Sequence, residues 1–451
     1  MQSEERPQVG QLISCTVDGF GSSGEGVAHH NGYTLFVDGA LPGEFVQVKL
    51  TESHKRYGKA RLLRIIDASA DRVTPPCPLF GKCGGCQLMH LSYPKQLEMK
   101  ERRVVDALKR IGHIEDAIVA PCLPSPSSLS YRNKIQLPVR EGASGIALGL
   151  YARGSHDLIE LEGCLIHSAL GETVYKLVRG QLQRSSIMPY DPVTGKGELR
   201  HVLIRTALKK EEVLLIFVTN YEPSKVLKSL AEKILASCSK VKGVVHNKQQ
   251  GRDNLILGKE YQLLCGAPSI QDTLSDLTFT ISPASFFQIN PAQAEILYAK
   301  AVELAALTGE ESVLDAYCGV GTLSLFFAQR AKQVIGVESV PEAIEDAKKN
   351  AKTNGIENVR FVTDAAETFI QTLSEIDLVL LNPPRAGCAP SFLDGIGKLS
   401  PDKLIYISCD PATLARDCHI LKNYGYRIVS IQPYDMFPQT AHVESVALLM
   451  K

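Results

Sequence analysis

Short apolar runs alternate with amphipathic stretches along the C-terminal part of the chain, and this alternation constrains the fold most strongly. Strands joined by helical crossovers build a sheet with helices on both faces, so we predict a doubly wound, Rossmann-like α/β domain at residues 278–451. Only a loop pattern separates the last two runs, which are therefore predicted to form an antiparallel hairpin. The seven predicted strands span residues 312–316, 333–338, 359–363, 377–382, 404–409, 426–431 and 445–450.

A chain of 451 residues exceeds what one ordinary hydrophobic core supports, so two or three domains are expected. Residues 1–67 contain short alternating runs separated by glycines and Pro42, which is typical of a small, OB-like β-barrel. Residues 68–277 mix strand and helix patterns and are predicted to form a central α+β domain. Within it, residues 94–112 have the apolar spacing of a helix, and the basic residues of that helix are expected to form an ordinary solvated face.

The formal net charge is zero, so binding to nucleic acid would need a local basic patch. Residues 47–66 contain one, in which Glu52 is the single acid and His54 and Tyr57 are interleaved. This patch is either a solvated strand face or a surface that follows a phosphate backbone. Its cations are Lys49, Lys55, Arg56, Lys59, Arg61 and Arg64.

The N-terminal residues lack the layout of a secretory signal, and every apolar run is shorter than a membrane span. We therefore expect a cytoplasmic protein that does not contact a membrane. Composition agrees, since 44% of the residues are apolar and 22% are charged, as in soluble globular proteins. In such a chain, the 12 cysteines indicate reduced thiols, a metal site or catalysis.

Three of these cysteines, Cys77, Cys83 and Cys86, lie within ten residues of one another. A zinc site usually takes two C-x2-C pairs, and this loop has one, so a cuboidal iron–sulfur cluster held by four thiolates fits better. The spacing differs from the C-x3-C-x2-C loop of radical enzymes, which disfavours radical chemistry. Cys122 and Cys164 are the candidates for the fourth ligand.

Cys409 ends the predicted strand 404–409, and a helix is predicted to begin two residues later. A thiol at a helix N-terminus can have a pKa well below its ordinary value of about 8.5, which suits a nucleophile. A core cysteine is the plainer alternative. Cys318 is a competing thiol, but its position inside a glycine-rich turn favours a wall residue.

That glycine-rich turn, residues 315–322, follows the first strand of the predicted sheet, at the edge where such sheets bind ligands. Glu338 ends the next strand, where its carboxylate could accept hydrogen bonds from two ribose hydroxyls. A nicotinamide nucleotide is one alternative, but the turn lacks the G-x-G-x-x-G that a pyrophosphate needs. The zwitterionic methionine part of S-adenosylmethionine fits better.

Two stretches resemble the signatures of RNA uridine-5-methyltransferases: residues 403–416, which contain Cys409, and residues 435–444, which end at Glu444. Residues 24–28 and 36–44 resemble the TRAM domain, a small RNA-binding barrel. The chain is therefore identified as a member of the TRAM-containing, iron–sulfur-containing ribosomal RNA branch of this family. Transfer-RNA enzymes of the family generally lack the barrel and the cysteine cluster, so large-subunit ribosomal RNA is the expected substrate.

The resemblance implies a role for each candidate residue. Cys409 would add to carbon 6 of uracil, and Glu444 would later remove the proton from carbon 5. Glu444 also opens the last predicted strand, so it should lie at the same sheet edge as Cys409. Cys164 would be the fourth ligand of a [4Fe-4S] cluster, and helix 94–112 would pack on the catalytic domain. The implied S-adenosylmethionine contacts are Gln288, Tyr317, Glu338 and Asn382, with Thr322 and Asp364 as additional candidates.

Two residues depart from the commoner family pattern, Asn382 in place of Asp and Asp410 in place of Asn. The family admits both exchanges. Two alternatives to the ribosomal RNA enzyme stay open, a transfer-RNA uridine-5-methyltransferase and an inactive iron–sulfur RNA-binding regulator. The sequence gives no sign of an obligate protein partner, so a monomer is expected.

Overall fold

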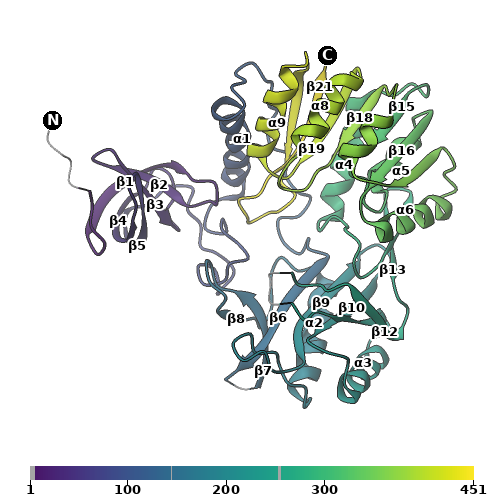
Figure 1. The fold of residues 1–451 in the computed structure, drawn as a ribbon. Helices are drawn as coiled ribbons and strands as arrows, with labels where there is room; N and C mark the ends of the chain where they lie inside the picture. Colours follow the sequence, from purple (N-terminus) through teal and green to yellow (C-terminus); the bar gives the residue numbers. More distant parts are fainter. Residues whose placement is uncertain (1–5, 144, 252–254) are drawn as a thin grey trace.

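The computed structural model describes residues 6–143, 145–251 and 255–451. Figure 1 shows a β-barrel standing to one side of a two-part body, in which the C-terminal domain lies above the central domain. Among the described residues, none of the helices has the length and apolar character needed to cross a membrane.

The N-terminal barrel consists of five strands that close because β4 pairs back onto β1. Alternate side chains point inward, so Ile13, Val17, Leu35, Val48 and Leu50 form a buried core. The predicted small barrel is thus confirmed. Its strands are β1 (Leu12–Phe20), β2 (Gly26–His30), β3 (Tyr33–Asp38), β4 (Phe45–Ser53) and β5 (Tyr57–Asp67).

Helix α1 (Tyr93–Arg110) follows the cysteine-rich loop and lies against the C-terminal domain (Figure 1). Its apolar face carries Val104 and Leu108 into the same core cluster as Leu414 and Ala415 of helix α9 (Pro411–Lys422). Pro94 stands in its first turn, where its missing N–H costs no helical hydrogen bond.

The central domain is built on a seven-stranded sheet in the order β12-β11-β10-β9-β6-β7-β8. Helices α2 (Ala169–Gln183) and α3 (Lys225–Ser237) pack on one face of this sheet, and the other face shares a core with the C-terminal domain. The strands are β6 (Lys134–Gly142), β7 (Gly145–Tyr151), β8 (Leu158–Glu160), β9 (Leu199–Ala207), β10 (Glu212–Thr219), β11 (Val241–Lys248) and β12 (Glu260–Gly266).

A hairpin of β13 (Ile270–Leu274) and β14 (Leu277–Ile281) joins the two parts of the body. The predicted boundary between residues 277 and 278 therefore falls at the start of β14. Phe279 of this strand is fully buried in the core that both parts share, so packing is continuous across the boundary.

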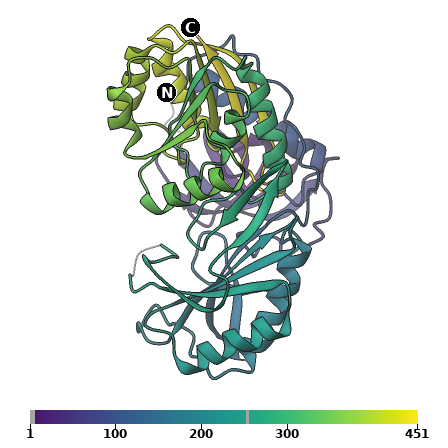
Figure 2. The ribbon, with the colours of Figure 1, turned by 90° about the vertical axis from the view of Figure 1, so that its right-hand side faces the viewer.

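The C-terminal domain, which lies above the central domain in the side view of Figure 2, contains the predicted seven-stranded sheet. Its strand order is β17-β16-β15-β18-β19-β21-β20. The first five strands in this order run parallel, and β21 runs antiparallel to both of its neighbours, which confirms the terminal hairpin. The strands are β15 (Ser312–Asp315), β16 (Gln333–Glu338), β17 (Val359–Thr363), β18 (Leu378–Leu381), β19 (Lys403–Ser408), β20 (Arg427–Tyr434) and β21 (Glu444–Met450). The other helices are α4 (Pro291–Ala305), α5 (Thr322–Ala328), α6 (Pro341–Thr353), α7 (Ala366–Phe369), the 3-10 turn η1 (Ile370–Thr372) and α8 (Pro390–Leu399).

Candidate active site

The candidate catalytic pair lies where β19 and β21 run side by side. Ser408, the last residue of β19, pairs with Ser445 of β21. Cys409 and Glu444 are the chain neighbours of these two residues, so both stand at the carboxyl edge of the parallel strands. Sheet register thus brings together two residues that are 35 positions apart in the sequence.

Cys409 occupies the turn between β19 and α9 and is half-buried. Asp410 caps the helix, since its carboxylate accepts hydrogen bonds from the backbone N–H groups of Ala412 (2.8 Å) and Thr413 (3.3 Å). Burial and the nearby Glu444 carboxylate raise the pKa of the Cys409 thiol to about 11, although Arg385 opposes this. The expectation of a lowered thiol pKa was wrong, because desolvation and a neighbouring acid outweigh the helix N-terminus.

Glu444 is only 3% exposed. Burial raises the pKa of its carboxyl group to about 8, and the positive charge of Arg385 limits the rise. A carboxylic acid with a pKa near neutrality can both take and return a proton, which is what a general base for this position needs.

This shift predicts a pH-dependent stability. Between about pH 4.5 and 8 the folded protein keeps a proton on Glu444 that the unfolded chain has released. The stability linked to this proton is fully present below about pH 4.5 and is lost as the pH rises through about 8. We expect the free energy of unfolding to fall between pH 5 and pH 8 by a few kcal/mol more in the wild type than in Glu444→Gln, as measured by urea unfolding. Equal pH dependence in both proteins would contradict the raised pKa.

Arg385 is the main residue of this site that was not predicted from the sequence. It lies in the Pro-Pro-Arg loop after β18, and its charge lowers the pKa of both Cys409 and Glu444. Buried Asp417 pins this loop, because its carboxylate accepts hydrogen bonds from the backbone N–H of Cys388 (2.8 Å) and from the hydroxyl of Tyr406 (2.7 Å). The Pro-Pro-Arg signature could have singled out Arg385, but only the fold brings it beside the pair.

Four of the six predicted cofactor contacts follow or end strands of the same sheet, and a fifth begins the helix that comes after β15. Tyr317 follows β15, Glu338 ends β16, and Asp364 follows β17. The backbone N–H of Asp364 donates to the carbonyl of Glu338 over 3.1 Å, so these two residues are neighbours. Thr322 begins α5, and Asn382 follows β18. All five therefore lie at the carboxyl edge of the parallel strands or at the helix that starts there.

Gln288, the sixth predicted contact, lies in the segment before α4. Its side chain contacts the hydroxyl of Tyr298. Burial raises the pKa of Tyr298, and the nearby charge of Glu444 raises it further. The fold therefore brings Gln288 toward the part of the sheet that carries the catalytic pair, although it comes from outside the sheet.

The glycine-rich turn after β15 gives this edge an accessible backbone. Gly319 and Gly321 both have positive φ angles, of 53° and 79°. A side chain at Gly321 would collide with Phe361, whereas one at Gly319 would stand in open space. The backbone at Gly319 can therefore be approached closely by a ligand.

The four cysteines predicted to hold a cluster lie near one another. Cys77, Cys86 and Cys164 border one small apolar cluster around Met89, and burial together with the other three thiols raises the pKa of Cys86 to about 12. In contrast, Cys122 packs in the core beneath α1. Among the described residues, no group of His, Cys, Asp or Glu side chains has the arrangement of a metal-ion site, so the predicted iron–sulfur centre is not shown.

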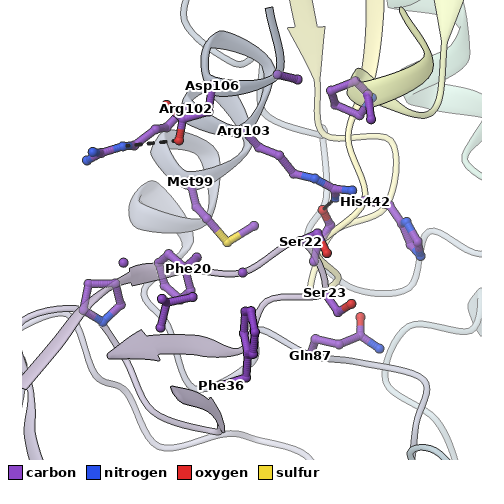
Figure 3. Close-up of a pocket in the computed structure, with 18 of the residues that line it drawn as sticks. Phe20, Ser22, Ser23, Phe36, Gln87, Met99, Arg102, Arg103, Asp106 and His442 are labelled. Carbon is purple, nitrogen blue, oxygen red and sulfur yellow. Dashed lines mark hydrogen bonds and ion pairs between the residues drawn. The ribbon is translucent and has the colours of Figure 1, made fainter. Parts of the chain in front are cut away.

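A cleft of about 1280 Å³ opens between the barrel, α1 and the C-terminal domain, and Cys409 lines it. Figure 3 shows Phe20, Ser22 and Ser23 reaching in from the barrel, while Arg103 extends from α1 toward the loop that carries His442. The guanidinium of Arg103 donates a hydrogen bond to the carbonyl of Ala441 in that loop. Cys409 is thus reached from a surface that three parts of the chain build.

More basic side chains line this cleft than the sequence predicted. The basic residues of α1 were predicted to form an ordinary solvated face, yet several of them border the cleft, together with Arg153 and Arg385. Helical periodicity could not reveal this, because the cleft exists only once the barrel stands opposite α1. The α1 residues concerned are Lys95, Arg102, Arg103 and Arg110.

Comparisons with known proteins agree with this arrangement. Residues 227–451 match the family model described as tRNA (Uracil-5-)-methyltransferase, and residues 6–63 match the TRAM domain. A protein of Clostridium tetani named uncharacterized RNA methyltransferase is 42% identical, over 96% of this chain and 95% of its own. A protein of Halalkalibacterium halodurans with the same description is 43% identical, over 97% and 96%.

The structure is also similar to that of tRNA (uracil-54, C5)-methyltransferase from Pyrococcus abyssi, solved with S-adenosyl-L-homocysteine. The similarity covers 97% of this chain and 100% of that one, with a TM-score of 0.78 and 27% sequence identity. The chain therefore belongs to the RNA uracil-5-methyltransferase family and is an S-adenosylmethionine-dependent RNA methyltransferase with a TRAM domain.

Proposed function

We propose that this enzyme methylates carbon 5 of a uridine in RNA through a covalent bond between Cys409 and the base. The observation that carries the proposal is the juxtaposition of Cys409, which follows β19, and Glu444, which begins the antiparallel neighbour β21, with Cys409 lining a large cleft. A nucleophile and a base with a pKa of about 8 are the two groups that this reaction requires.

Carbon 5 of uracil is a weak nucleophile, so the ring must first be activated. The Cys409 thiol gives up its proton to water in the cleft as its sulfur bonds to carbon 6, and the π electrons of the ring move toward the oxygen on carbon 4. S-adenosylmethionine supplies the methyl group that carbon 5 takes up. Glu444 then removes the proton from carbon 5, the bond between carbon 6 and sulfur breaks, and the ring double bond returns.

The charge of Arg385 suits both steps. It favours the thiolate form of Cys409 when sulfur attacks, and it favours the carboxylate form of Glu444 when the base is needed. Since each group carries a raised pKa, the positive charge offsets part of the cost of ionising two neighbouring acids in a partly buried site.

The residues along the sheet edge fit S-adenosylmethionine. The open space at Gly319 leaves room for the methionine part, and the carboxylate of Glu338, at the end of β16, would accept hydrogen bonds from the ribose hydroxyls. The residues proposed to hold the cofactor are Gln288, Tyr317, Thr322, Glu338, Asp364 and Asn382.

RNA is proposed to enter along the cleft, with the target uridine flipped toward Cys409. Phe36 lines the cleft, and its ring lies 5.6 Å from that of Tyr57, which in turn stacks on His54 at 4.7 Å. This row of rings leads from the cleft to the basic strands β4 and β5. Aromatic rings beside cations are the combination that unpaired nucleotides favour.

Large-subunit ribosomal RNA is the substrate proposed from the sequence. Domain content favours ribosomal RNA less strongly, however, because the Pyrococcus abyssi transfer-RNA enzyme is similar over 97% of this chain. Transfer RNA is therefore the second candidate. Mapping 5-methyluridine in both RNAs, in cells with and without the gene, tests the choice. Loss of the modification at a ribosomal position supports the first candidate, and loss in transfer RNA alone supports the second.

A [4Fe-4S] cluster on Cys77, Cys83, Cys86 and Cys164 is also part of the proposal. The thiols influence one another's pKa, and the charge of Arg132 favours the thiolate form of Cys86. The loop supplies one C-x2-C pair instead of the two that zinc usually takes, so a cluster held by four thiolates fits this set better than zinc. With all four irons ligated, the cluster would be structural.

Anaerobically purified protein is expected to contain about four irons and four sulfides per chain. Cys164→Ala should lose most of them, because the cluster would lack one thiolate. Cys122→Ala is the matched control, since Cys122 lies in a different core cluster and should leave the metal content unchanged. Zinc without sulfide, or an intact cluster in Cys164→Ala, would contradict this assignment.

A further inference from the structure

The segment that carries Gln288 from β14 into α4 is held by the central domain. Arg205 of β9 is 3% exposed, and its Nη1 donates to the carbonyls of Ser282 (2.6 Å) and Ser285 (2.6 Å). It also donates to the carbonyl of Pro283 over 3.2 Å. One buried guanidinium thus donates hydrogen bonds to three carbonyls of a segment that lies outside regular secondary structure.

Asn133 holds the other end of the same segment. Its side-chain amide donates to the carbonyl of Gln288 over 2.9 Å, and its backbone N–H donates to the carbonyl of Ile289 over 3.0 Å. The carbonyl of Asn133 accepts in turn from the backbone N–H of Thr206, the neighbour of Arg205 on β9. Arg205 of β9 and Asn133, which directly precedes β6, therefore lie beside each other where these two strands pair.

These contacts decide where the Gln288 side chain points. Buried carbonyls outside regular structure need donors, and here the donors come from another domain. Phe287 is buried in the shared core, with its ring 6.2 Å from that of Phe279, so the segment cannot rotate freely. The side chain of Gln288 then contacts Tyr298 of α4, a buried residue that lies near the charges of Glu444 and Asp315.

We propose that Arg205 and Asn133 are positioning residues for the cofactor, so that the central domain builds one wall of the S-adenosylmethionine site. This inference rests on the proposed role of Gln288 in cofactor binding. Neither residue touches the reacting atoms, and both act through the backbone of residues 282–289.

A purely structural role is the competing explanation, and the chain offers a matched control for it. Arg200 lies on the same strand, is 6% exposed, and donates to the carbonyls of Gln249 (2.7 Å) and Gly251 (2.8 Å). It therefore resembles Arg205 in burial and in its bonding to carbonyls, but it holds a segment far along the chain from Gln288.

The test compares steady-state kinetics of Arg205→Met, Asn133→Ala and Arg200→Met in the full-length enzyme. For Arg205→Met and Asn133→Ala we expect the KM for S-adenosylmethionine to rise about 10–100-fold, with kcat and the KM for RNA changed less than about threefold. Arg205→Lys should restore part of the loss, because an ammonium group can still donate to some of these carbonyls. Asn133→Ala removes only one side-chain donor, so the KM for S-adenosylmethionine can still be measured in this variant if Arg205→Met does not fold.

Two results would overturn the inference. The first is an unchanged KM for S-adenosylmethionine in the folded variants, and the second is an equal rise in Arg200→Met. Gln288→Ala separates this failure from failure of the proposed function. If Gln288→Ala raises the KM and the anchor variants do not, only the inference is wrong. If Gln288→Ala leaves the KM unchanged, the cofactor role of Gln288 is wrong and the inference falls with it.

Discussion

Cys409→Ala is expected to abolish methyl transfer while leaving the affinity for S-adenosylmethionine nearly unchanged. Without sulfur addition at carbon 6, carbon 5 stays too weak a nucleophile to take the methyl group, so the loss should reach the detection limit of the assay. Most of the residues proposed to hold the cofactor follow β15 to β18, whereas Cys409 follows β19, so the variant should still bind S-adenosylhomocysteine with an affinity close to that of the wild type. Labelled methyl transfer and a cofactor titration measure the two quantities.

Cys318→Ala is the matched control for this experiment. Cys318 is buried in the glycine-rich turn, and burial raises the pKa of its thiol well above the ordinary value. This variant should keep its methyl transfer activity. Activity in Cys409→Ala, or its loss in Cys318→Ala with the fold intact, would show that the wrong thiol has been assigned. Failure of the wild type itself to bind the cofactor would favour the inactive RNA-binding regulator.

Glu444→Gln is expected to separate the two halves of the reaction. Glutamine keeps the size of the side chain but cannot take the proton from carbon 5, so addition and methyl transfer should proceed while release slows about 10²–10⁴-fold. A covalent, methylated protein–RNA species should accumulate with ordinary uridine RNA. A denaturing gel with methyl-labelled cofactor detects it.

Asp435→Asn serves as the comparison, since Asp435 is the other carboxylate of the second signature. The structure gives Asp435 a different role, because it is fully buried in an ion pair with Lys100 of α1. Breaking this pair should destabilise the fold without trapping RNA on the protein. Label retained by Asp435→Asn alone would transfer the role of base to Asp435, and release at the wild-type rate from Glu444→Gln would remove Glu444 from the mechanism.

The sequence predicted the C-terminal sheet closely because its central strands β18, β19 and β21 are buried on both faces and read as continuous apolar runs. The helical crossovers and the loop before the last strand predicted the doubly wound sheet and its terminal hairpin, whereas the order of the strands comes from the structure. Register then explains why Cys409 and Glu444 meet. A strand that enters the sheet antiparallel beside β19 must begin where β19 ends.

The sequence could not predict features that depend on packing between distant segments. The thiol pKa of Cys409 was expected to fall, because a helix N-terminus is visible in the sequence and the burial beside Glu444 is not. The cleft has the same origin, since it requires the barrel to face α1. The clamp of Arg205 on residues 282–285 also joins positions about 80 apart, which no local pattern records.

The central claim is that Cys409 bonds to the uracil ring, and a trapped complex tests it most directly. RNA carrying 5-fluorouridine should stop the reaction after methyl transfer, because fluorine cannot leave carbon 5 as a proton does. Incubation of wild-type enzyme with this RNA and S-adenosylmethionine, followed by nuclease and protease digestion and mass spectrometry, should find a methylated fluorouridine nucleotide on the peptide that contains Cys409. A nucleotide on the peptide that contains Cys318, or the absence of any covalent complex with an RNA that the enzyme does methylate, would contradict the account.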